Sequence, residues 1–452
     1  MSDKSGKSAL KIVLRDWKPM PVIDHAEGIY LYDTAGKRYI DGTAGNIVVN
    51  IGHGVKAVQD AMHRQAQKVS FVPAFAFANQ PAIDLAERMA GLAPGVMKDA
   101  CKIWFGVTGT DAGDSAIKLA RAYYLEKGES SRHIVISRWM SYHGNSNSAA
   151  GVHGHTSRRE LYYPLYINSP HIPPAYCYRC DFGKTYPGCD LLCARALEKE
   201  ICRQGAQNVA AFIVEPVGAA MGTVPAPPGY FQIVREICDR YGVLFIADEV
   251  ITGWGRTGKM WGVDHWDVTP DIIFTAKGMC SGYTPIAATI ARDSIWEPLE
   301  SKGVPFRAGH TFNFNPVSCA GALANLEYLL EHKLWENAER MGKYLLDQGR
   351  KLLKHKIVGD VRGLGLTFSV EFVQDRESKV PFPPSLRLSG RLAQAALDRG
   401  LVVMPFSGLV NGVAGDGISV GPPLTITQTQ IDDILKILDD AITAVELELG
   451  IQ

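Results

Sequence analysis

Residues 243–250, Val-Leu-Phe-Ile-Ala-Asp-Glu-Val, and residues 271–278, Asp-Ile-Ile-Phe-Thr-Ala-Lys-Gly, are two apolar runs that each end on a charged side chain. Apolar runs without strict alternation are typical of parallel strands that helices cover on both faces. The carboxyl ends of such strands lie at one open edge of the sheet. The sequence therefore predicts that Asp248 and Lys277, which end the two runs, face the same cleft.

Three more apolar runs, separated by helical stretches, extend this pattern to residues 102–105, 133–137 and 211–215. Strands that alternate with helices predict an α/β fold with a mostly parallel sheet. The alternating aromatic residues and turn signals of 22–41 predict a small antiparallel ribbon, and short strands are expected around 363–372 and 418–420. We expect both chain ends to form a smaller α+β domain (1–75 and 326–452) beside a large domain (76–325).

The composition indicates a small-molecule partner. The chain has 452 residues, with 47 Lys plus Arg against 47 Asp plus Glu, so no net charge attracts nucleic acid or a membrane surface. No apolar run is long enough to span a bilayer, and the start does not read as a secretory signal. Nine cysteines in such a chain favour reduced thiols. We therefore expect a cytoplasmic protein.

Asp248 and Lys277 carry the strongest chemical signal. A buried carboxylate needs a cationic or protonated partner, and a pyridinium nitrogen is such a partner; a metal-binding or helix-capping role is the alternative. Lysine at a strand end becomes a nucleophilic amine when desolvation lowers its pKa, although a lone lysine is more often a solvated surface residue. Their positions on consecutive strands favour the catalytic interpretation.

A phosphate site and an aromatic wall are predicted nearby. Thr108-Gly109-Thr110 joins a strand to a helical stretch, and the free N–H groups of a helix start bind anions. The same tripeptide is also an ordinary N-cap. Tyr142, which precedes His143, could set its ring against a pyridine face, although an isolated aromatic residue is more often part of the core.

Together these motifs resemble the class III aminotransferases, the omega-aminotransferase subgroup of fold type I enzymes that use pyridoxal 5'-phosphate (PLP). The match covers nearly the whole chain and combines many motifs in one order. They lie at 28–33, 36–42, 52–53, 108–110, 142–144, 214–217, 248–258, 277–278, 309–312 and 422–424.

The resemblance implies a role for each matching position. Lys277 would form the Schiff base and carry the transferred proton, and Asp248 would pair with the ring nitrogen. The other cofactor-binding positions that it implies are Gly109 and Thr110 at the phosphate, Tyr142 and Val250 on the two ring faces, His143 beside Tyr142, Glu215 near the ring hydroxyl, and Thr311 at the phosphate of the neighbouring subunit. The last role implies a homodimer with shared active sites, while tetramers stay open.

The substrate pocket departs from the family pattern. Ser419 stands where many relatives carry an arginine that clamps an α-carboxylate, and serine cannot form this bidentate contact. Pro405 and Asn145 occupy two other positions where relatives place arginines. Arg158, Arg159 and Arg307 are candidate replacements. We also place Ile47 and Trp17 in the predicted pocket.

Four cysteines form a separate cluster, Cys177-x-x-Cys180 followed by Cys189 and Cys193. Four thiolates at such spacing could hold a structural zinc ion. The alternative is that they are reduced cysteines packed beside a loop and a helix.

The sequence thus predicts an aminotransferase that moves an amino group from an amine or an omega- or beta-amino acid to a keto acid such as pyruvate or 2-oxoglutarate. Epimerisation or decarboxylation-coupled transamination on the same scaffold is the nearest alternative. A catalytically silent scaffold protein is a weaker one, because it would be expected to lose Lys277 or Asp248.

Overall fold

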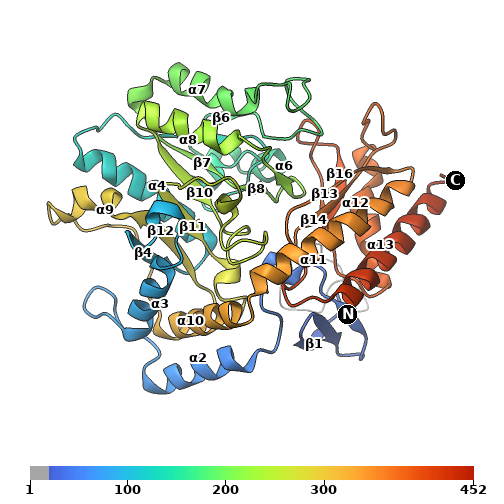
Figure 1. The fold of residues 1–452 in the computed structure, drawn as a ribbon, viewed down its shortest axis with the longest axis horizontal. Helices are drawn as coiled ribbons and strands as arrows, with labels where there is room; N and C mark the ends of the chain where they lie inside the picture. The colour runs from blue at the N-terminus through green and yellow to red at the C-terminus, as the bar shows by residue number, and fades with distance from the viewer. Residues whose placement is uncertain (1–19, 452) are drawn as a thin grey trace.

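A seven-stranded sheet forms the centre of the molecule in the computed structural model, which describes residues 20–451 (Figure 1). The strand order is β4-β12-β11-β10-β7-β5-β6. Only β12 runs antiparallel to its neighbours, so the sheet is mixed and mostly parallel, and the predicted α/β class is confirmed. The strands are β4 (Cys101–Gly106), β5 (Ile134–Arg138), β6 (His171–Ile172), β7 (Val209–Val214), β10 (Leu244–Asp248), β11 (Ile272–Thr275) and β12 (Ala287–Arg292).

All five strands expected from the sequence are present, and two more appear. Strand β12 consists largely of alanine, which has a low preference for strands. Strand β6 has only two residues. Neither strand leaves a clear signal in the sequence. Each is formed through its hydrogen-bonded pairing with neighbouring strands: β12 pairs with β11 and β4, and β6 pairs with β5.

Each central strand serves two hydrophobic cores. In β10, Phe245 and Ala247 face one core, whereas Leu244 and Ile246 face the other. Helices α7 (Leu192–Gln204) and α8 (Tyr230–Tyr241) complete the first core, and α4 (Gly109–Glu126) lies in the second. Burial on both faces explains why the strand sequences are continuously apolar.

The helices of the chain surround the sheets, and Figure 1 labels most of them. The remaining helices of the large sheet region and its flanks are α1 (Ala44–Ile47), α2 (Lys56–Lys68), α3 (Gln80–Ala90), α5 (Asn147–Val152), α6 (Thr156–Arg159), α9 (Asp293–Glu300) and α10 (Pro316–Glu331). A two-stranded ribbon of β8 (Val217–Gly218) and β9 (Val224–Pro225) follows β7.

A second, antiparallel sheet of four strands in the order β13-β14-β16-β15 lies beside the first. It comprises β13 (Val358–Gly363), β14 (Phe368–Phe372), β15 (Met404–Phe406) and β16 (Asp416–Val420), with helices α11 (Leu334–Gly349), α12 (Leu388–Asp398) and α13 (Gln428–Glu448). The expected N-terminal ribbon is also present, as β1 (Ile23–Glu27), β2 (Tyr30–Asp33) and β3 (Arg38–Ile40).

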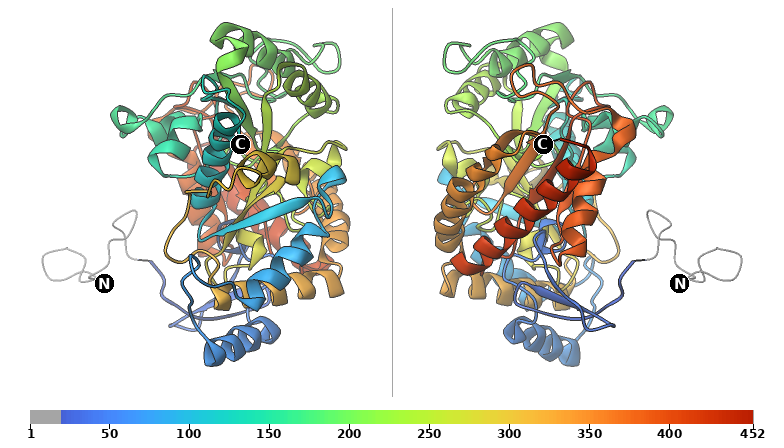
Figure 2. Two further views of the ribbon diagram at one scale, coloured as in Figure 1. Left: turned by 90° about the vertical axis from the view of Figure 1, so that its left-hand side faces the viewer. Right: turned by 90° about the vertical axis from the view of Figure 1, so that its right-hand side faces the viewer.

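The two chain ends meet at this second sheet. The N–H of Ile40 donates to the carbonyl of Gly400 at 2.7 Å, and the N–H of Gly421 donates to the carbonyl of Gly42 at 2.7 Å. Figures 1 and 2 show the blue N-terminal strands beside the orange and red C-terminal elements. The domain boundaries at 75/76 and 325/326 stay predictions. None of the helices between residues 20 and 451 combines the length and apolar content needed to cross a membrane.

Candidate active site

Asp248 and Lys277 lie at the carboxyl ends of two paired parallel strands. Asp248 is the last residue of β10 and pairs with Phe274 in β11, so Lys277 follows this pair by three residues. The short helix η5 (Lys277–Met279) begins at Lys277, whose φ of 47° turns the chain sharply at the strand end. The chain thus brings both charged residues to one edge of the sheet.

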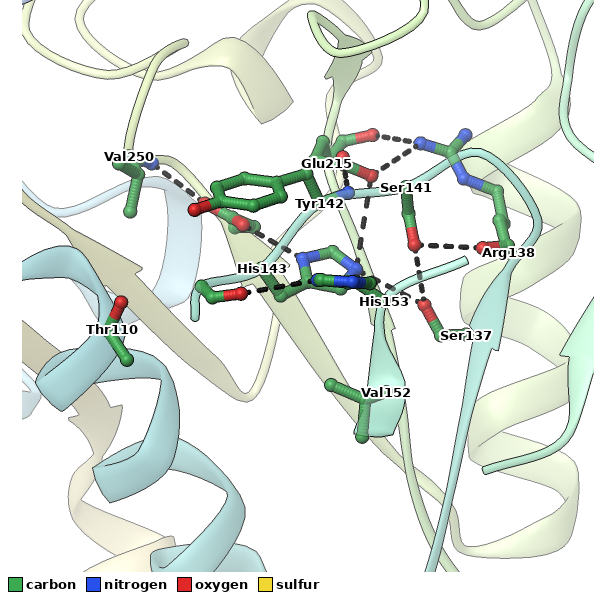
Figure 3. Close-up of polar contacts among 12 residues, drawn as sticks. Thr110, Ser137, Arg138, Ser141, Tyr142, His143, Val152, His153, Glu215 and Val250 are labelled. Atoms are coloured by element: carbon green, nitrogen blue, oxygen red, sulfur yellow. Dashed lines mark hydrogen bonds and ion pairs between the residues drawn. The ribbon is translucent and has the colours of Figure 1, made fainter. Parts of the chain in front are cut away.

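Asp248 is held by two hydrogen bonds in a buried position. Only 5% of it is exposed; Nδ1 of His143 donates to its Oδ2 at 2.8 Å, and the N–H of Val250 donates to its Oδ1 at 3.0 Å (Figure 3). Burial raises the pKa of Asp248, while His143 opposes that rise. A protonated ring nitrogen would supply the positive charge that this buried carboxylate lacks, so Asp248 fits a PLP ring.

The amine of Lys277 is prepared to act as a nucleophile. Its pKa is lowered to about 8 from the ordinary value of 10.5, mainly by burial; Asp248 opposes this shift, while the charges of Arg256 and Arg158 contribute to it. Within residues 20–451 no hydrogen bond or ion pair engages its Nζ. A lysine with a lowered pKa loses its proton near neutral pH, which is the state that attacks a carbonyl carbon.

Tyr142 is fixed through its backbone and its ring. Its N–H donates to Oε1 of Glu215 at 2.9 Å, and Glu215 also accepts a hydrogen bond from Nη2 of Arg138 at 3.2 Å (Figure 3). The ring of His153 stacks on the Tyr142 ring with centroids 5.4 Å apart. Burial lowers the pKa of His153 to about 3, so this ring is neutral.

The start of α4 has the features of a phosphate cradle. Oγ1 of Thr108 accepts a hydrogen bond from the N–H of Asp111, and the Asp111 carboxylate accepts one from the N–H of Thr108. These two bonds cap the helix. The N–H groups of Gly109 and Thr110 have no acceptor among the described residues. A Cβ at Gly109 would lie 3.2 Å from both methyl carbons of Val250, so glycine permits close packing there. This arrangement suits an anion such as the PLP phosphate.

Other predicted residues lie at a distance from this cluster or are engaged elsewhere. Thr311 is exposed on a loop near the start of α4. In this loop, Nε2 of His310 lies 3.5 Å from Oδ1 of Asp111. Ile47 is buried against Gly421, and the hydroxyl of Ser419 shares a 2.7 Å hydrogen bond with Ser369. Trp17 lies outside the described residues.

The structure distinguishes the three candidate arginines. The guanidinium of Arg158 lies over the Tyr142 ring, 4.8 Å from its centroid. Arg159 is buried and donates to Oδ1 of Asn168 at 2.8 Å. Arg307 is exposed on the loop that precedes Thr311. Only Arg158 contacts an aromatic residue of the candidate active site.

Within residues 20–451 no group of three or more His, Cys, Asp or Glu side chains is arranged to hold a metal ion, so the structure does not support the zinc site, which stays a prediction beside the alternative of reduced cysteines. All four thiols are free. Cys189 is buried while Cys177 is exposed, and burial raises the pKa of Cys193 to about 11.

Arg256 is a buried residue that the sequence analysis did not single out. Its Nη2 donates to Oδ1 of Asn50 at 2.6 Å and its Nη1 donates to the carbonyl of Leu366 at 3.1 Å, so it joins three distant segments of the chain. Its charge also contributes to the lowered pKa of Lys277. The sequence held no signal for its burial, because an arginine in a turn such as Gly253-Trp254-Gly255-Arg256 is ordinarily exposed.

Comparison with known proteins identifies relatives over nearly the full length. Residues 14–442 match the family "Aminotransferase class-III". The uncharacterized aminotransferase YodT of Bacillus subtilis is 37% identical, over 95% of this chain and 96% of that protein. The putrescine–pyruvate aminotransferase of Pseudomonas aeruginosa is 33% identical, over 94% of this chain and 91% of that protein.

Two solved structures share the fold. An (S)-enantioselective omega-transaminase from Thermomicrobium roseum has a TM-score of 0.90 and 39% identity, over 95% of this chain and 93% of that one. An amine transaminase from an uncultivated Pseudomonas species in its PLP-bound form has a TM-score of 0.90 and 32% identity, over 96% and 97%. The chain therefore belongs to the class III aminotransferases and is an enzyme that uses PLP.

Proposed function

We propose that Lys277 is the residue that binds PLP covalently and carries the proton of amino transfer, with Asp248 as the partner of the ring nitrogen. One observation supports this most. Lys277, whose pKa is lowered to about 8, and the buried carboxylate of Asp248 lie at the carboxyl ends of two adjacent parallel strands. Among residues 20–451, Lys277 forms no ion pair and Asp248 forms one, with His143.

The surrounding residues would hold the cofactor. Gly109 and Thr110 would bind its phosphate, Tyr142 and Val250 would flank its ring, and Glu215 would lie near the ring hydroxyl. Bound PLP supplies an electron sink for the pair of electrons left when the donor carbon loses its proton. An ionised Asp248 keeps the ring nitrogen protonated, which strengthens that sink, and His143 keeps Asp248 ionised by donating to it.

Lys277 then acts as the acid and base of the reaction. With the donor held at the cofactor, the Nζ of Lys277 would take the proton from the amine-bearing carbon of the donor. A pKa near neutrality suits a group that must both accept and return a proton.

We propose an amine or an omega- or beta-amino acid as donor, with pyruvate or 2-oxoglutarate as acceptor. Two observations support this. Ser419, at the position of a family carboxylate clamp, is buried and already bonded to Ser369. In addition, the P. aeruginosa relative is named for putrescine, a diamine, and for pyruvate.

We also propose a homodimer, because several large apolar side chains of the described residues lie exposed. Phe75 is 94% exposed and Ile167 is 88% exposed. Phe312, which follows Thr311, is 62% exposed and packs edge-on against Phe71. Exposed apolar groups of this size mark contact surfaces, and the family resemblance implies that Thr311 of a second copy serves the phosphate site.

The test is covalent trapping followed by a donor panel. Protein incubated with PLP and reduced with borohydride should carry the cofactor on Lys277, as read by peptide mass spectrometry. Lys277→Ala should lose the label and all amino transfer. Lys333→Ala is the matched control, because Lys333 has a similar φ of 46° but lies on the surface. A label on another lysine, or amino transfer by Lys277→Ala, would refute the assignment.

A further inference from the structure

Arg158 is an exposed cation at the candidate active site that has no assigned partner. It lies in α6, the short helix that follows the Tyr142 segment, and its guanidinium is 4.8 Å from the Tyr142 ring centroid. In the region from residue 20 to residue 451 its side chain makes no hydrogen bond or ion pair. Its charge also lowers the pKa of Lys277, which places it within electrostatic reach of the reacting amine.

Stacking on an aromatic ring prepares a guanidinium for anion binding. The contact with Tyr142 keeps the Arg158 guanidinium over that ring, while its N–H groups make no hydrogen bond among the described residues. A planar fork with free N–H groups matches the two oxygens of a carboxylate, with two parallel hydrogen bonds. Lysine or serine cannot provide this geometry.

The groups around Arg158 leave its charge uncompensated. His155, in front of α6, is neutral, because burial and the charge of Arg158 lower its pKa to about 4. The neighbouring Arg159 is buried and bonded to Asn168, so it cannot turn towards the cleft without breaking that bond. Among the described residues no carboxylate lies within 4.0 Å of the Arg158 guanidinium, so an anionic ligand would supply its ion pair.

The loop between β15 and β16 of the second sheet packs against the start of α6. Gly412, on the loop between β15 and β16, lies so close to Thr156 that a Cβ on it would clash with the threonine side chain. Gly412 also has a φ of 72°, which favours glycine. The loop thus fixes the first residue of α6 and, through it, the position of Arg158.

We propose that Arg158 binds the carboxylate of the keto-acid acceptor and of the amino acid formed from it. This inference rests on the proposed function, since it assigns a substrate contact within the same site. It gives the enzyme a carboxylate anchor where Ser419 provides none. Donors without a carboxylate would occupy the same space without forming this pair of hydrogen bonds.

The test compares two acceptors that differ only in charge, pyruvate and its uncharged methyl ester. We expect Arg158→Gln to lower the ratio of kcat/KM for pyruvate to kcat/KM for methyl pyruvate by about 10- to 100-fold, the loss of a charge-assisted pair of hydrogen bonds. Arg158→Lys should fall between this variant and the wild type, because it keeps the charge and loses the fork.

Two further measurements separate the outcomes. Calorimetric titration with propanoate, which has the carboxylate but no keto group, should show weaker binding to Arg158→Gln, while borohydride still traps PLP on the variant. Arg38→Gln is the matched control, since Arg38 is also exposed and stacks on Tyr30 at 4.7 Å, but in the N-terminal ribbon.

The assignment would be overturned if the ratio of the two kcat/KM values stayed unchanged in Arg158→Gln, including the case in which both values fell equally. Arg158 would then only support the Tyr142 ring. Failure of the proposed function would look different, because the wild-type protein itself would then lack the trapped cofactor and amino transfer.

Discussion

Replacing His143 with leucine removes the 2.8 Å hydrogen bond from its Nδ1 to Oδ2 of Asp248. A hydrogen bond to a charged group contributes about 1.5 to 3 kcal/mol, and each 1.4 kcal/mol changes an equilibrium constant about tenfold. If Asp248 holds the protonated ring of PLP, we expect His143→Leu to bind PLP roughly 10- to 100-fold more weakly.

The pH dependence of binding gives a second readout. His143 lowers the pKa of Asp248 against the opposing effect of burial, so its removal moves that pKa upward. PLP affinity should decline as the pH falls and Asp248 takes up a proton. In His143→Leu this decline should begin at a higher pH than in the wild type. The assay is an absorbance titration of the apoenzyme with PLP across the pH range from acid to neutral.

His355→Leu is the matched control. His355 is a buried histidine in the other sheet region, where it contacts the carboxylates of Glu446 and Asp439 at 2.8 Å each. Its replacement should reduce thermal stability and leave PLP affinity unchanged. An unaltered affinity and pH profile in His143→Leu would refute the role of the His143–Asp248 pair, as would an equal loss of affinity in His355→Leu.

Three other changes probe the rest of the molecule. The pKa of Lys277 is about 8 in the folded protein against an ordinary value of 10.5. Between these two pH values the unfolded chain binds one more proton than the folded chain, so the free energy of unfolding of the wild-type apoenzyme rises with pH. Lys277→Met should lack this rise when urea unfolding is measured from pH 7 to 10. Gly342→Ala places a Cβ against the carbonyl of Gly365 and should cost about 1 to 3 kcal/mol, as measured by thermal unfolding. Ser419→Ala removes the 2.7 Å hydrogen bond to Ser369 and should cost about 1 kcal/mol without raising the KM for pyruvate; a large rise would show that Ser419 does bind substrate.

The sequence alone determined the fold class, the family and the position of the candidate active site. Apolar runs that end on Asp248 and Lys277 carry this information locally, because a strand buried on both faces must be continuously apolar and its charged end must lie at the sheet edge. The turn at Gly109 is also readable, since the residues of a helix start are adjacent in the chain. The strand β12 was missed because alanine carries little strand preference.

Only the tertiary structure decided which distant residues meet. His143 and Asp248 are 105 positions apart and the sequence gives no sign of their hydrogen bond. The same holds for Arg256, which contacts Asn50 and Leu366. Cysteine spacing suggested zinc, yet the packing of the loop buries Cys189, exposes Cys177 and builds no metal site among the described residues. Spacing along the chain limits which contacts are possible, but side-chain packing selects among them, and it alone distinguishes Arg158 from Arg159.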